Sequence, residues 1–196
     1  LINNGINAIE LSAGNYTIKT ENYLKKKIKN TKFQVHNYFP PPKKSFVFNL
    51  ASQNKRIQNG SIKLAKKAII LSKKLERPMY SFHAGFLADP NVNELGGKIK
   101  KQLLSNRKDA LKRFIKNVKH LSKFAEKHKV KLLIENNNLS QKEFNTFKKN
   151  SVLMATPREI IYVLKKTPKN VSLLLDLAHL KVSSNILNFN LDEAYD

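Results

Sequence analysis

Cysteine and tryptophan are absent from this 196-residue sequence, and glycine occurs only six times. Without cysteine, disulfide bonds and thiolate catalysis are excluded. The shortage of glycine argues against a dinucleotide-binding sheet, which needs a glycine-rich turn after its first strand. The glycine pair Gly96-Gly97 follows no predicted strand.

Long apolar runs are also absent, and none approaches the roughly 18 consecutive residues that a membrane helix requires. We therefore expect a soluble, cytoplasmic protein with no membrane partner. The hydrophobic content of 41% is enough for one core, and no change in composition divides the chain. Residues 1–196 are expected to form a single domain.

Acidic residues are scarce: 14 Asp and Glu stand against 37 Lys and Arg, which gives a formal net charge of +23. Such a charge is typical of proteins that bind nucleic acid or anionic membranes. However, 32 of the basic residues are lysine, whereas arginine is the better ligand for phosphates and bases. The 23 asparagines and 15 isoleucines complete the residue set of an AT-rich genome. We interpret the charge as genome composition on solvated helices, and a polyanion-binding surface is the alternative.

Apolar residues at helical spacing predict amphipathic helices over residues 61–75 and 109–128, both with lysines on the opposite face. His120 and His128 belong to the second helix and are expected at the surface. A third helix is predicted to begin at Thr156 and end near Lys166. Its start signal, TPRE, combines a threonine N-cap, proline at the first helical position and glutamate three residues after the cap.

Five apolar runs between these segments are interpreted as strands, and each carries one ionisable side chain at its C-terminal end. The runs NAIELSAG, FQVHNYF, YSFHAGF, VKLLIE and VSLLLD carry Glu10, His36, His83, Glu135 and Asp176 respectively. The last two runs are apolar on both faces, as in parallel strands covered by helices. Alternating strands and helices imply a parallel sheet, either open or closed into a barrel, and in a barrel the C-terminal strand ends meet at one mouth. We predict neighbouring parallel strands of a (β/α)8 TIM barrel with these five side chains at one rim.

The segments HNYFPPPKKSFVFNLAS, FHAG, LLIEN and LLLDLAH, in this order, resemble the xylose-isomerase-like TIM barrels. That superfamily is shared by sugar phosphate isomerases and epimerases and by the endonuclease IV group of apurinic endonucleases. The resemblance runs from about Gly5 to the end, and it makes NAIELSAG the second barrel strand and SLLLDLAH the sixth. Strand one would then precede Leu1, and strands seven and eight would follow Asp196. The missing initial methionine and the final LDEAYD, interpreted as a helix start, agree with a fragment covering about strands 2 to 6.

The resemblance implies that Glu135 and Asp176 are metal ligands. The residues themselves support this, because an unpaired carboxylate at the end of an apolar strand is costly and a divalent cation removes that cost. Carboxylates and imidazoles together suit Zn, Mn, Co or Mg. The alternative is that each acid caps the next helix or pairs with a lysine.

The resemblance also implies a set of substrate-binding residues. His179 would bind substrate hydroxyls, or a further metal in the endonuclease branch. His36 and His83 correspond to zinc ligands in that branch and to pocket residues in the sugar branch; the alternative for each is a core histidine bonded to backbone. Asn136, directly after the metal-type glutamate, is expected to contact substrate, whereas Glu10 fits a rim position and a site position equally well.

The chain departs from the endonuclease pattern in three motifs and in the three-proline insertion after His36. It has AGF, NNN and DLAH where that pattern has glycine-serine-histidine, a glycine-rich turn and a cysteine. We therefore favour a divalent-metal-dependent isomerase or epimerase of a small sugar or sugar phosphate, acting by proton transfer next to a carbonyl, with Glu135 as both ligand and base. The alternatives are a zinc-dependent apurinic/apyrimidinic endonuclease, with nucleic acid as its partner, and a barrel that has lost catalysis. The 196-residue piece by itself is expected to be inactive and to bind metal poorly, because it supplies part of the ligand set.

Overall fold

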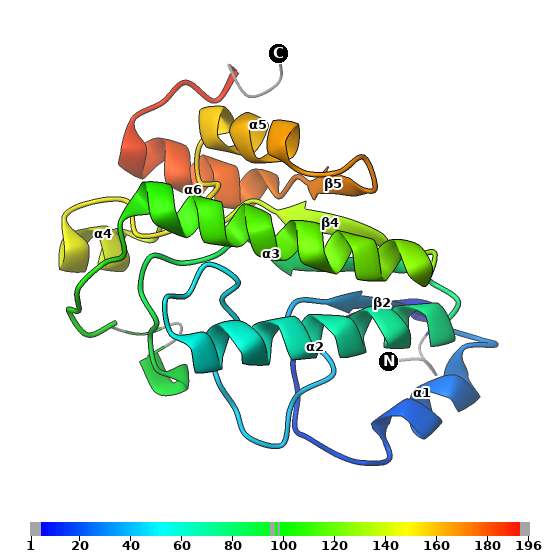
Figure 1. The fold of residues 1–196 in the computed structure, drawn as a ribbon. Coiled ribbons are helices and arrows are strands. Elements are labelled where there is room, and N and C mark those ends of the chain that lie inside the picture. Colours follow the sequence, from blue (N-terminus) through cyan, green and yellow to red (C-terminus); the bar gives the residue numbers. More distant parts are fainter. Residues whose placement is uncertain (1–4, 95–96, 98, 193–196) are drawn as a thin grey trace.

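The computed structural model describes residues 5–94, 97 and 99–192, and its strands form one five-stranded parallel sheet (Figure 1). The strands are β1 (Ala8–Leu11), β2 (Lys32–His36), β3 (Met79–His83), β4 (Lys131–Glu135) and β5 (Val171–Leu174). The helices are α1 (Thr20–Lys27), α2 (Lys55–Lys74), α3 (Arg107–Lys127), α4 (Gln141–Phe147), α5 (Pro157–Lys166) and α6 (Leu177–Leu187), with a short 3-10 helix, η2 (Val92–Glu94). Strand order follows chain order without reversal, as in a barrel and unlike a doubly wound sheet. The predicted partial barrel is confirmed. Most of the expected helix start LDEAYD, and Gly96, lie outside the described residues.

The strand register aligns the C-terminal ends of the strands. His83 lies beside Glu135 in the β3–β4 pair, and His36 lies beside Ser81 in the β2–β3 pair. Because the strands are parallel, every side chain at a strand end emerges at the same edge of the sheet. The predicted rim of ionisable residues therefore forms.

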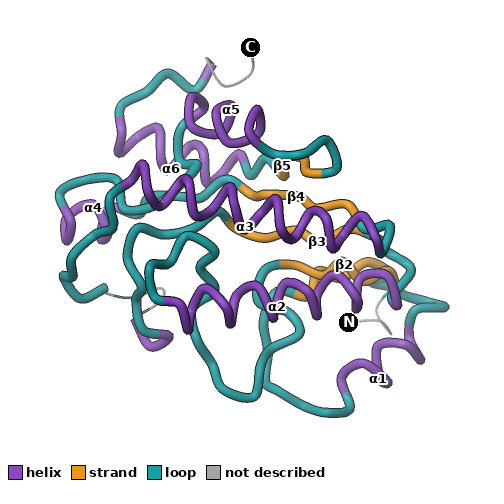
Figure 2. The backbone as a smooth tube through the Cα atoms, in the orientation of Figure 1, coloured by secondary structure: helices purple, strands orange, loops and turns teal. Residues whose placement is uncertain are grey.

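The core lies between the sheet and the long helices α2 and α3, which run side by side over the strands (Figure 2). The helices contribute the predicted apolar stripes, and their contacts with the strands are fully or almost fully buried: Leu64, Ala68, Leu71, Phe114, Val118 and Leu121 from the helices, and Tyr80, Phe82, Leu132 and Ile134 from the strands. Burying each of the leucine, isoleucine, valine and phenylalanine side chains among these stabilises the fold by about 1.5 to 3 kcal/mol.

Side-chain caps fix where the helices begin. The Asn54 side chain accepts hydrogen bonds from the backbone N–H groups of Arg56 and Ile57, so α2 begins six residues before the expected start of its apolar stripe. Asn106 caps α3 in the same way through the N–H of Asp109. The third helix agrees with prediction, since Thr156 accepts from the N–H of Glu159 and Pro157 occupies the first turn.

The fifth strand differs from its prediction in two ways. It ends at Leu174, so Asp176 lies two residues beyond it, as the N-cap of α6. It is also only partly buried, with Leu175 38% exposed just after it, whereas VSLLLD was expected to be covered on both faces. The reason is that β5, like β1, is an edge strand of the described sheet and packs against one neighbouring strand.

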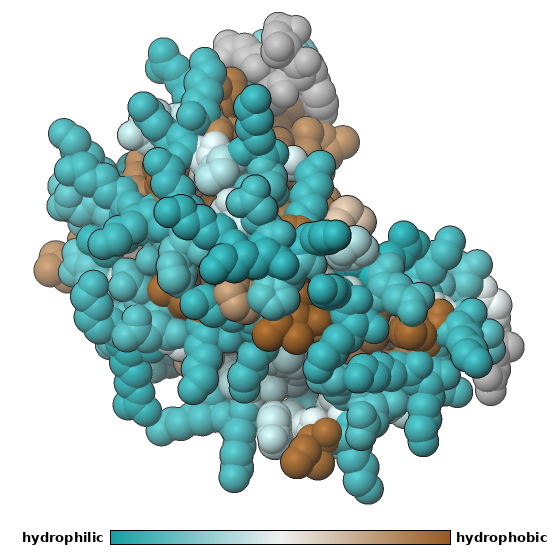
Figure 3. All heavy atoms as spheres, turned by 45° about the vertical axis from the view of Figure 1, so that its right-hand side comes forward, coloured by the Kyte–Doolittle hydropathy of each residue, from teal (hydrophilic) through white to brown (hydrophobic). Residues whose placement is uncertain are grey.

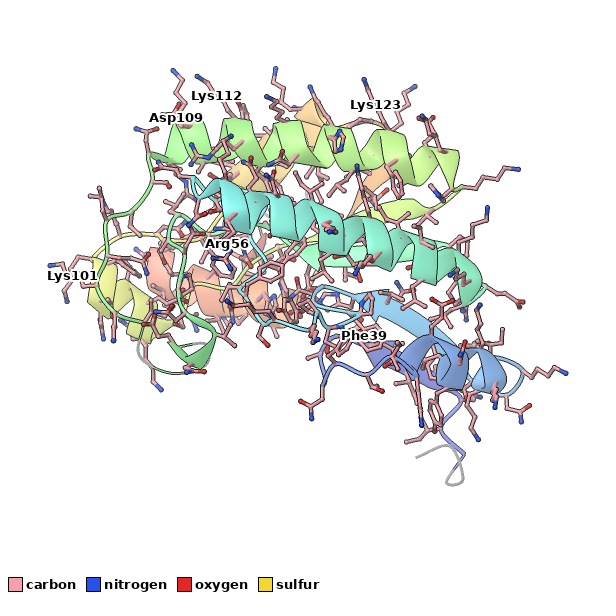
Figure 4. The ribbon with its side chains drawn as sticks, turned by 60° about the horizontal axis from the view of Figure 1, so that its bottom comes forward. Phe39, Arg56, Lys101, Asp109, Lys112 and Lys123 are labelled. Atoms are coloured by element: carbon pink, nitrogen blue, oxygen red, sulfur yellow. The ribbon has the colours of Figure 1, made fainter. Side chains whose placement is uncertain are left out.

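Lysines cover the outer surface of the helices. On α3 the exposed Lys108, Lys112, Lys116, Lys119, Lys123 and Lys127 follow one another at intervals of three or four residues. Figure 4 shows Lys112 and Lys123 extending from α3 away from the rest of the molecule. Figure 3 shows long hydrophilic side chains over most of one face, with hydrophobic residues in small separate groups. Positive charge is thus distributed around the helices, as expected for solvated faces.

The two histidines of the lysine-rich helix lie away from the strand ends. His120 is exposed, as predicted, but His128 is half-buried. Its ring stacks on Phe124 with centroids 4.3 Å apart, and its Nδ1 lies 2.9 Å from the Phe124 carbonyl oxygen. Within the described part of the chain, no helix combines the length and the apolar character needed to cross a membrane.

Candidate active site

A cavity of about 840 Å³ opens at the C-terminal edge of the sheet. All five side chains predicted for the rim line it, together with His179. One part of its wall carries these acids and imidazoles. The remainder is largely apolar and aromatic, formed by Tyr38, Phe46, Val47, Phe48, Phe86, Val92, Leu174 and Leu175.

Glu135 lies at the centre of the ionisable cluster. Its Oε2 is 3.4 Å from Nε2 of His36, and its Oε1 is 3.3 Å from Nδ1 of His179 and 3.9 Å from Nδ1 of His83. Nε2 of His36 also lies 3.4 Å from Nε2 of His83. Two groups of potential ligand atoms therefore share this carboxylate: His36, His83 and Glu135, and Glu135, Asp176 and His179. Within each group the ligand atoms lie within 4.8 Å of one another.

Burial changes the acidity of this cluster. Only 6% of Glu135 is exposed, and its burial, followed by the nearby negative charges of Asp176 and Glu10, raises its pKa to about 7. Burial, followed by the charges of His36 and His179, lowers the pKa of His83 to about 3. Burial also lowers the pKa of His36. The cavity thus favours a partly protonated glutamate beside neutral imidazoles.

Hydrogen bonds behind the cluster orient the imidazoles. Nδ1 of His36 lies 2.9 Å from the Ser81 hydroxyl, which turns Nε2 toward Glu135. Nδ1 of His179 lies 2.9 Å from the carbonyl oxygen of Asn136. Because a carbonyl oxygen can only accept, Nδ1 of His179 is the donor in this bond, and the tautomer that fits it has its lone pair on Nε2.

Asn136 lies behind the cavity and does not line it. Its side chain is fully buried and forms a reciprocal pair of bonds with the backbone of Asp176: Nδ2 donates to the carbonyl oxygen at 3.0 Å, and Oδ1 accepts from the N–H at 2.8 Å. The amide group is therefore occupied by the chain that carries Asp176, where substrate contact was expected. The link joins the end of β4 to the start of α6.

Asp176 combines a structural and a site position. Its Oδ1 accepts from the N–H of His179 and caps α6, which is the helix-capping alternative weighed from the sequence. Its Oδ2 lies 3.8 Å from Nε2 of the same histidine. One oxygen caps the helix while the other contributes to the cluster. Glu10 lines the cavity from β1 but belongs to neither ligand group and is exposed.

Two asparagines that the sequence did not single out fix the loops around the cavity. Asn49 donates through Nδ2 to Asp89 Oδ1 at 2.9 Å and to the Phe86 carbonyl oxygen at 3.1 Å, and its Oδ1 accepts from the N–H of Phe86. A Cβ on Gly85 would lie 2.6 Å from Cβ of Ala51, so only glycine allows this close approach. The segments FNLAS and FHAG therefore pack directly against each other.

Asn137 likewise connects two segments that are distant in the sequence, those of Ala84 and Leu153. Its Nδ2 donates to the carbonyl oxygens of Ala84 at 2.6 Å and Leu153 at 3.1 Å. Two of the three asparagines of the NNN motif, Asn136 and Asn137, are thus buried and cross-link distant segments. The available signal was the position of NNN directly after a buried strand.

Comparisons with known proteins decide the family. The sequence profile described as "Xylose isomerase-like TIM barrel" matches residues 2–193. The chain belongs to this family. Among curated proteins, none matches.

Several solved structures with the same fold are named as sugar epimerases. An L-ribulose 3-epimerase superposes with a TM-score of 0.67 at 17% identity, covering 98% of this chain and 56% of its own. A D-tagatose 3-epimerase-like protein gives 0.64 at 19% identity, covering 88% and 57%. D-psicose 3-epimerase from Clostridium cellulolyticum H10, solved with D-tagatose, gives 0.62 at 19% identity, covering 92% and 57%. The xylose isomerase-like chain thus spans somewhat more than half the length of these structures.

Proposed function

We propose that the protein is a divalent-metal-dependent sugar isomerase or epimerase that transfers a proton at a carbon next to a carbonyl. The observation that carries the proposal is the buried Glu135 carboxylate with its pKa raised to about 7, which lies close to the strand-end imidazoles of His36 and His83 and to His179 of α6. Solved structures of the same fold that are named as sugar 3-epimerases support it.

The donor atoms of the cluster fit a divalent cation. In each group the carboxylate oxygens and imidazole nitrogens lie close enough together to bind the same ion. Burial also favours the neutral form of His36 and His83, and the neutral imidazole is the form that binds metal. Glu135 and Asp176 would hold the ion, and Nε2 of His179 is free to join them. A bound Zn, Mn, Co or Mg ion would act there as a Lewis acid toward the substrate carbonyl.

Glu135 is suited to move the proton. A general base works best when its pKa lies near the working pH, and burial brings this carboxyl group to that value. His36 and His83 come from β2 and β3, on one side of Glu135 in the sheet, whereas Asp176 follows β5 on the other side. We propose that the two histidines accept hydrogen bonds from substrate hydroxyls. Asn136 acts through Asp176, as a positioning residue.

The rest of the cavity is suited to a neutral carbon skeleton. Among the described residues that line it, none is lysine or arginine, although the chain carries 37 such residues. Aromatic rings such as Phe46, Phe48 and Phe86 offer surfaces for the C–H faces of a sugar. We therefore propose that the part of the substrate held here is uncharged.

The test is solvent proton exchange in the full-length protein. Ketoses, aldoses and their phosphates are incubated in D₂O with the metal-loaded protein, and deuterium at the carbon next to the carbonyl is measured by NMR together with metal content. One divalent ion per chain and exchange with at least one sugar support the proposal. Absence of exchange across these sugars in the metal-loaded protein rejects it and leaves a barrel without this activity.

Zinc-dependent hydrolysis of a phosphodiester at an abasic site is the second candidate. It is favoured by the two ligand groups that share Glu135, because adjacent metal ions joined by a carboxylate are typical of phosphoryl-transfer sites. Two or three zinc ions per chain, lost in part with His36→Ala or His83→Ala, would select it. It also requires tight binding to abasic duplex at physiological salt, whereas dispersed lysines predict weak binding that modest salt removes.

A further inference from the structure

A second cavity lies beside the catalytic one, and we propose that it binds a phosphoryl group carried by the substrate. It has a volume of about 300 Å³ and lies between the start of α1, the proline loop of residues 40–46 and the middle of α2. Lys43, Lys63 and Lys67 line it. The assignment of the phosphoryl group to a sugar rests on the proposed function; the anion site itself does not.

The sequence of α2 places two of these lysines on one face. Lys63 and Lys67 are one helical turn apart, and Gly60 precedes them on the same side. Gly60 has no Cβ, and the Phe46 ring packs there, 3.3 Å from where a Cβ would lie. The proline loop is thereby seated on α2, and Lys43 is brought to the same cavity as Lys63 and Lys67.

The proline loop is held in a fixed shape. The Phe46 N–H donates to the Tyr38 hydroxyl at 2.8 Å, and the two rings meet edge to face with centroids 5.6 Å apart. Consecutive prolines 40–42 restrict the backbone between them. These restraints hold the backbone at Lys43 in place, which lowers the entropic cost of binding a ligand there.

The charges of this cavity are uncompensated within the described residues. Its lining contains three lysines and no acid, and none of the three forms an ion pair there. The acid of the neighbouring helix, Glu21, is already bonded to Lys25 at 3.0 Å and Lys74 at 2.8 Å. Like charges around one cavity repel, and a dianionic phosphoryl group would reduce that repulsion while accepting hydrogen bonds from the ammonium groups.

The two cavities complement each other. Phe46 lines both of them, so the cavity of the carboxylate and imidazole cluster adjoins the cavity of the lysines at this side chain. Among the described residues, the lining of the catalytic cavity has no lysine or arginine, whereas that of the neighbouring cavity has three lysines. A sugar phosphate, or a sugar linked to a diphosphate, would place its reacting carbons beside Glu135 and its phosphoryl group beside Lys63 and Lys67.

The experiment measures anion binding directly in the full-length protein. Inorganic phosphate, pyrophosphate and a hexose 6-phosphate are titrated by calorimetry into the wild type and the Lys63→Gln/Lys67→Gln variant. Loss of two charge-assisted contacts is expected to weaken binding roughly tenfold or more. The matched control is Lys119→Gln/Lys123→Gln, which removes the same charge from exposed positions on α3 and is expected to leave binding unchanged. All four lysines are exposed, so the variants should fold, which circular dichroism verifies.

Two further measurements distinguish a failure of this inference from a failure of the proposed function. Glu135→Gln should retain phosphate binding even if no sugar is turned over, so the lysine site can stand when the isomerase assignment fails. If a sugar phosphate is turned over, Lys63→Gln/Lys67→Gln should raise its KM about tenfold and leave kcat and the KM of the neutral sugar unchanged. Phosphate binding that is undetectable in the wild type, equal in the two double variants, or replaced by binding to abasic duplex alone would overturn the inference.

Discussion

Nε2 of His36 on β2 lies 3.4 Å from Oε2 of Glu135 on β4, across the intervening strand β3. The contact exists because three neighbouring parallel strands end at the same edge of the sheet, with His36 beside Ser81 and His83 beside Glu135. Both groups are buried, which raises the pKa of the glutamate and lowers that of the histidine. Such opposed shifts are typical of sites that hold a metal or move a proton.

Replacing Glu135 by glutamine tests its double role. Glu135→Gln removes an anionic ligand and the proposed base, so we expect metal affinity to fall and proton exchange to drop about 10²- to 10⁴-fold. Exchange is followed by NMR in D₂O and metal affinity by titration with Mn and Zn. Lys119→Gln is the control for an unrelated charge change. Wild-type exchange in Glu135→Gln would contradict the assignment.

The pH dependence of stability should report the buried His83. Its pKa is lowered to about 3, whereas an unfolded histidine has a pKa near 6.5, so the unfolded chain binds the proton first as pH falls. The free energy of unfolding of the metal-free protein is therefore expected to decrease as pH is lowered from about 6.5 toward 3. Urea unfolding at several pH values measures it, and His83→Gln should flatten the dependence.

Glu135 should act in the opposite direction. Its pKa is raised to about 7, so the folded state holds the proton more tightly than the unfolded state between about 4.5 and 7. Its contribution to stability is present at low pH and is lost as pH rises through that window. Glu135→Gln should therefore steepen the loss of stability on acidification. A variant that leaves the slope unchanged would show that the burial of Glu135 does not perturb its titration.

Removing the Asn136 amide tests whether it positions Asp176. Asn136→Ala breaks the two hydrogen bonds to the Asp176 backbone, at 3.0 and 2.8 Å, without touching a proposed ligand. Metal affinity is expected to fall about 10- to 100-fold, as for other residues that orient metal ligands. The neighbouring Asn138 is exposed, and Asn138→Ala should bind metal normally. Equal affinities in the two variants would reject the positioning role.

The ion pair between Arg107 and Glu159 should be the strongest single polar contribution to stability outside the cavity. Arg107 Nη2 lies 2.7 Å from Glu159 Oε2 and also donates to the carbonyl oxygen of Val152 at 2.8 Å. Because the Glu159 side chain is only 11% exposed, Arg107→Met should leave its charge poorly compensated. We expect a loss of about 2 to 4 kcal/mol of unfolding free energy. Lys112→Gln, which breaks an exposed pair with Asp109 on the same helix, should cost less than about 1 kcal/mol.

Prediction from the sequence succeeded where the signal was periodic or local. The apolar stripes of α2 and α3 and the start at Thr156 were readable because helix spacing and capping are properties of a few neighbouring residues. The end of β5 was predicted two residues too late. An apolar run predicts a strand, but it does not show where backbone pairing with β4 stops.

The asparagines show the limit of local reasoning. Asn136 was expected in the pocket because it follows Glu135, and the structure uses its amide to hold the Asp176 backbone. Asn49 and Asn137 were not selected at all, although both are buried and cross-link loops that are distant in the sequence. A side-chain amide forms hydrogen bonds equally well with solvent, with its own turn or with a distant carbonyl group. The presence of an asparagine therefore does not predict which partner it binds.

The sequence by itself determined the alternation of strands and helices, and it marked the five strand-end side chains, since burial periodicity is written in residue order. Only the tertiary structure decided that His36, His83, Asp176 and His179 surround one carboxylate, and that three lysines gather behind Phe46. The physical reason is that strand pairing and loop packing join residues far apart in the chain. The pKa of Glu135 depends on that assembly, because burial and neighbouring charge belong to the folded molecule and not to the residue.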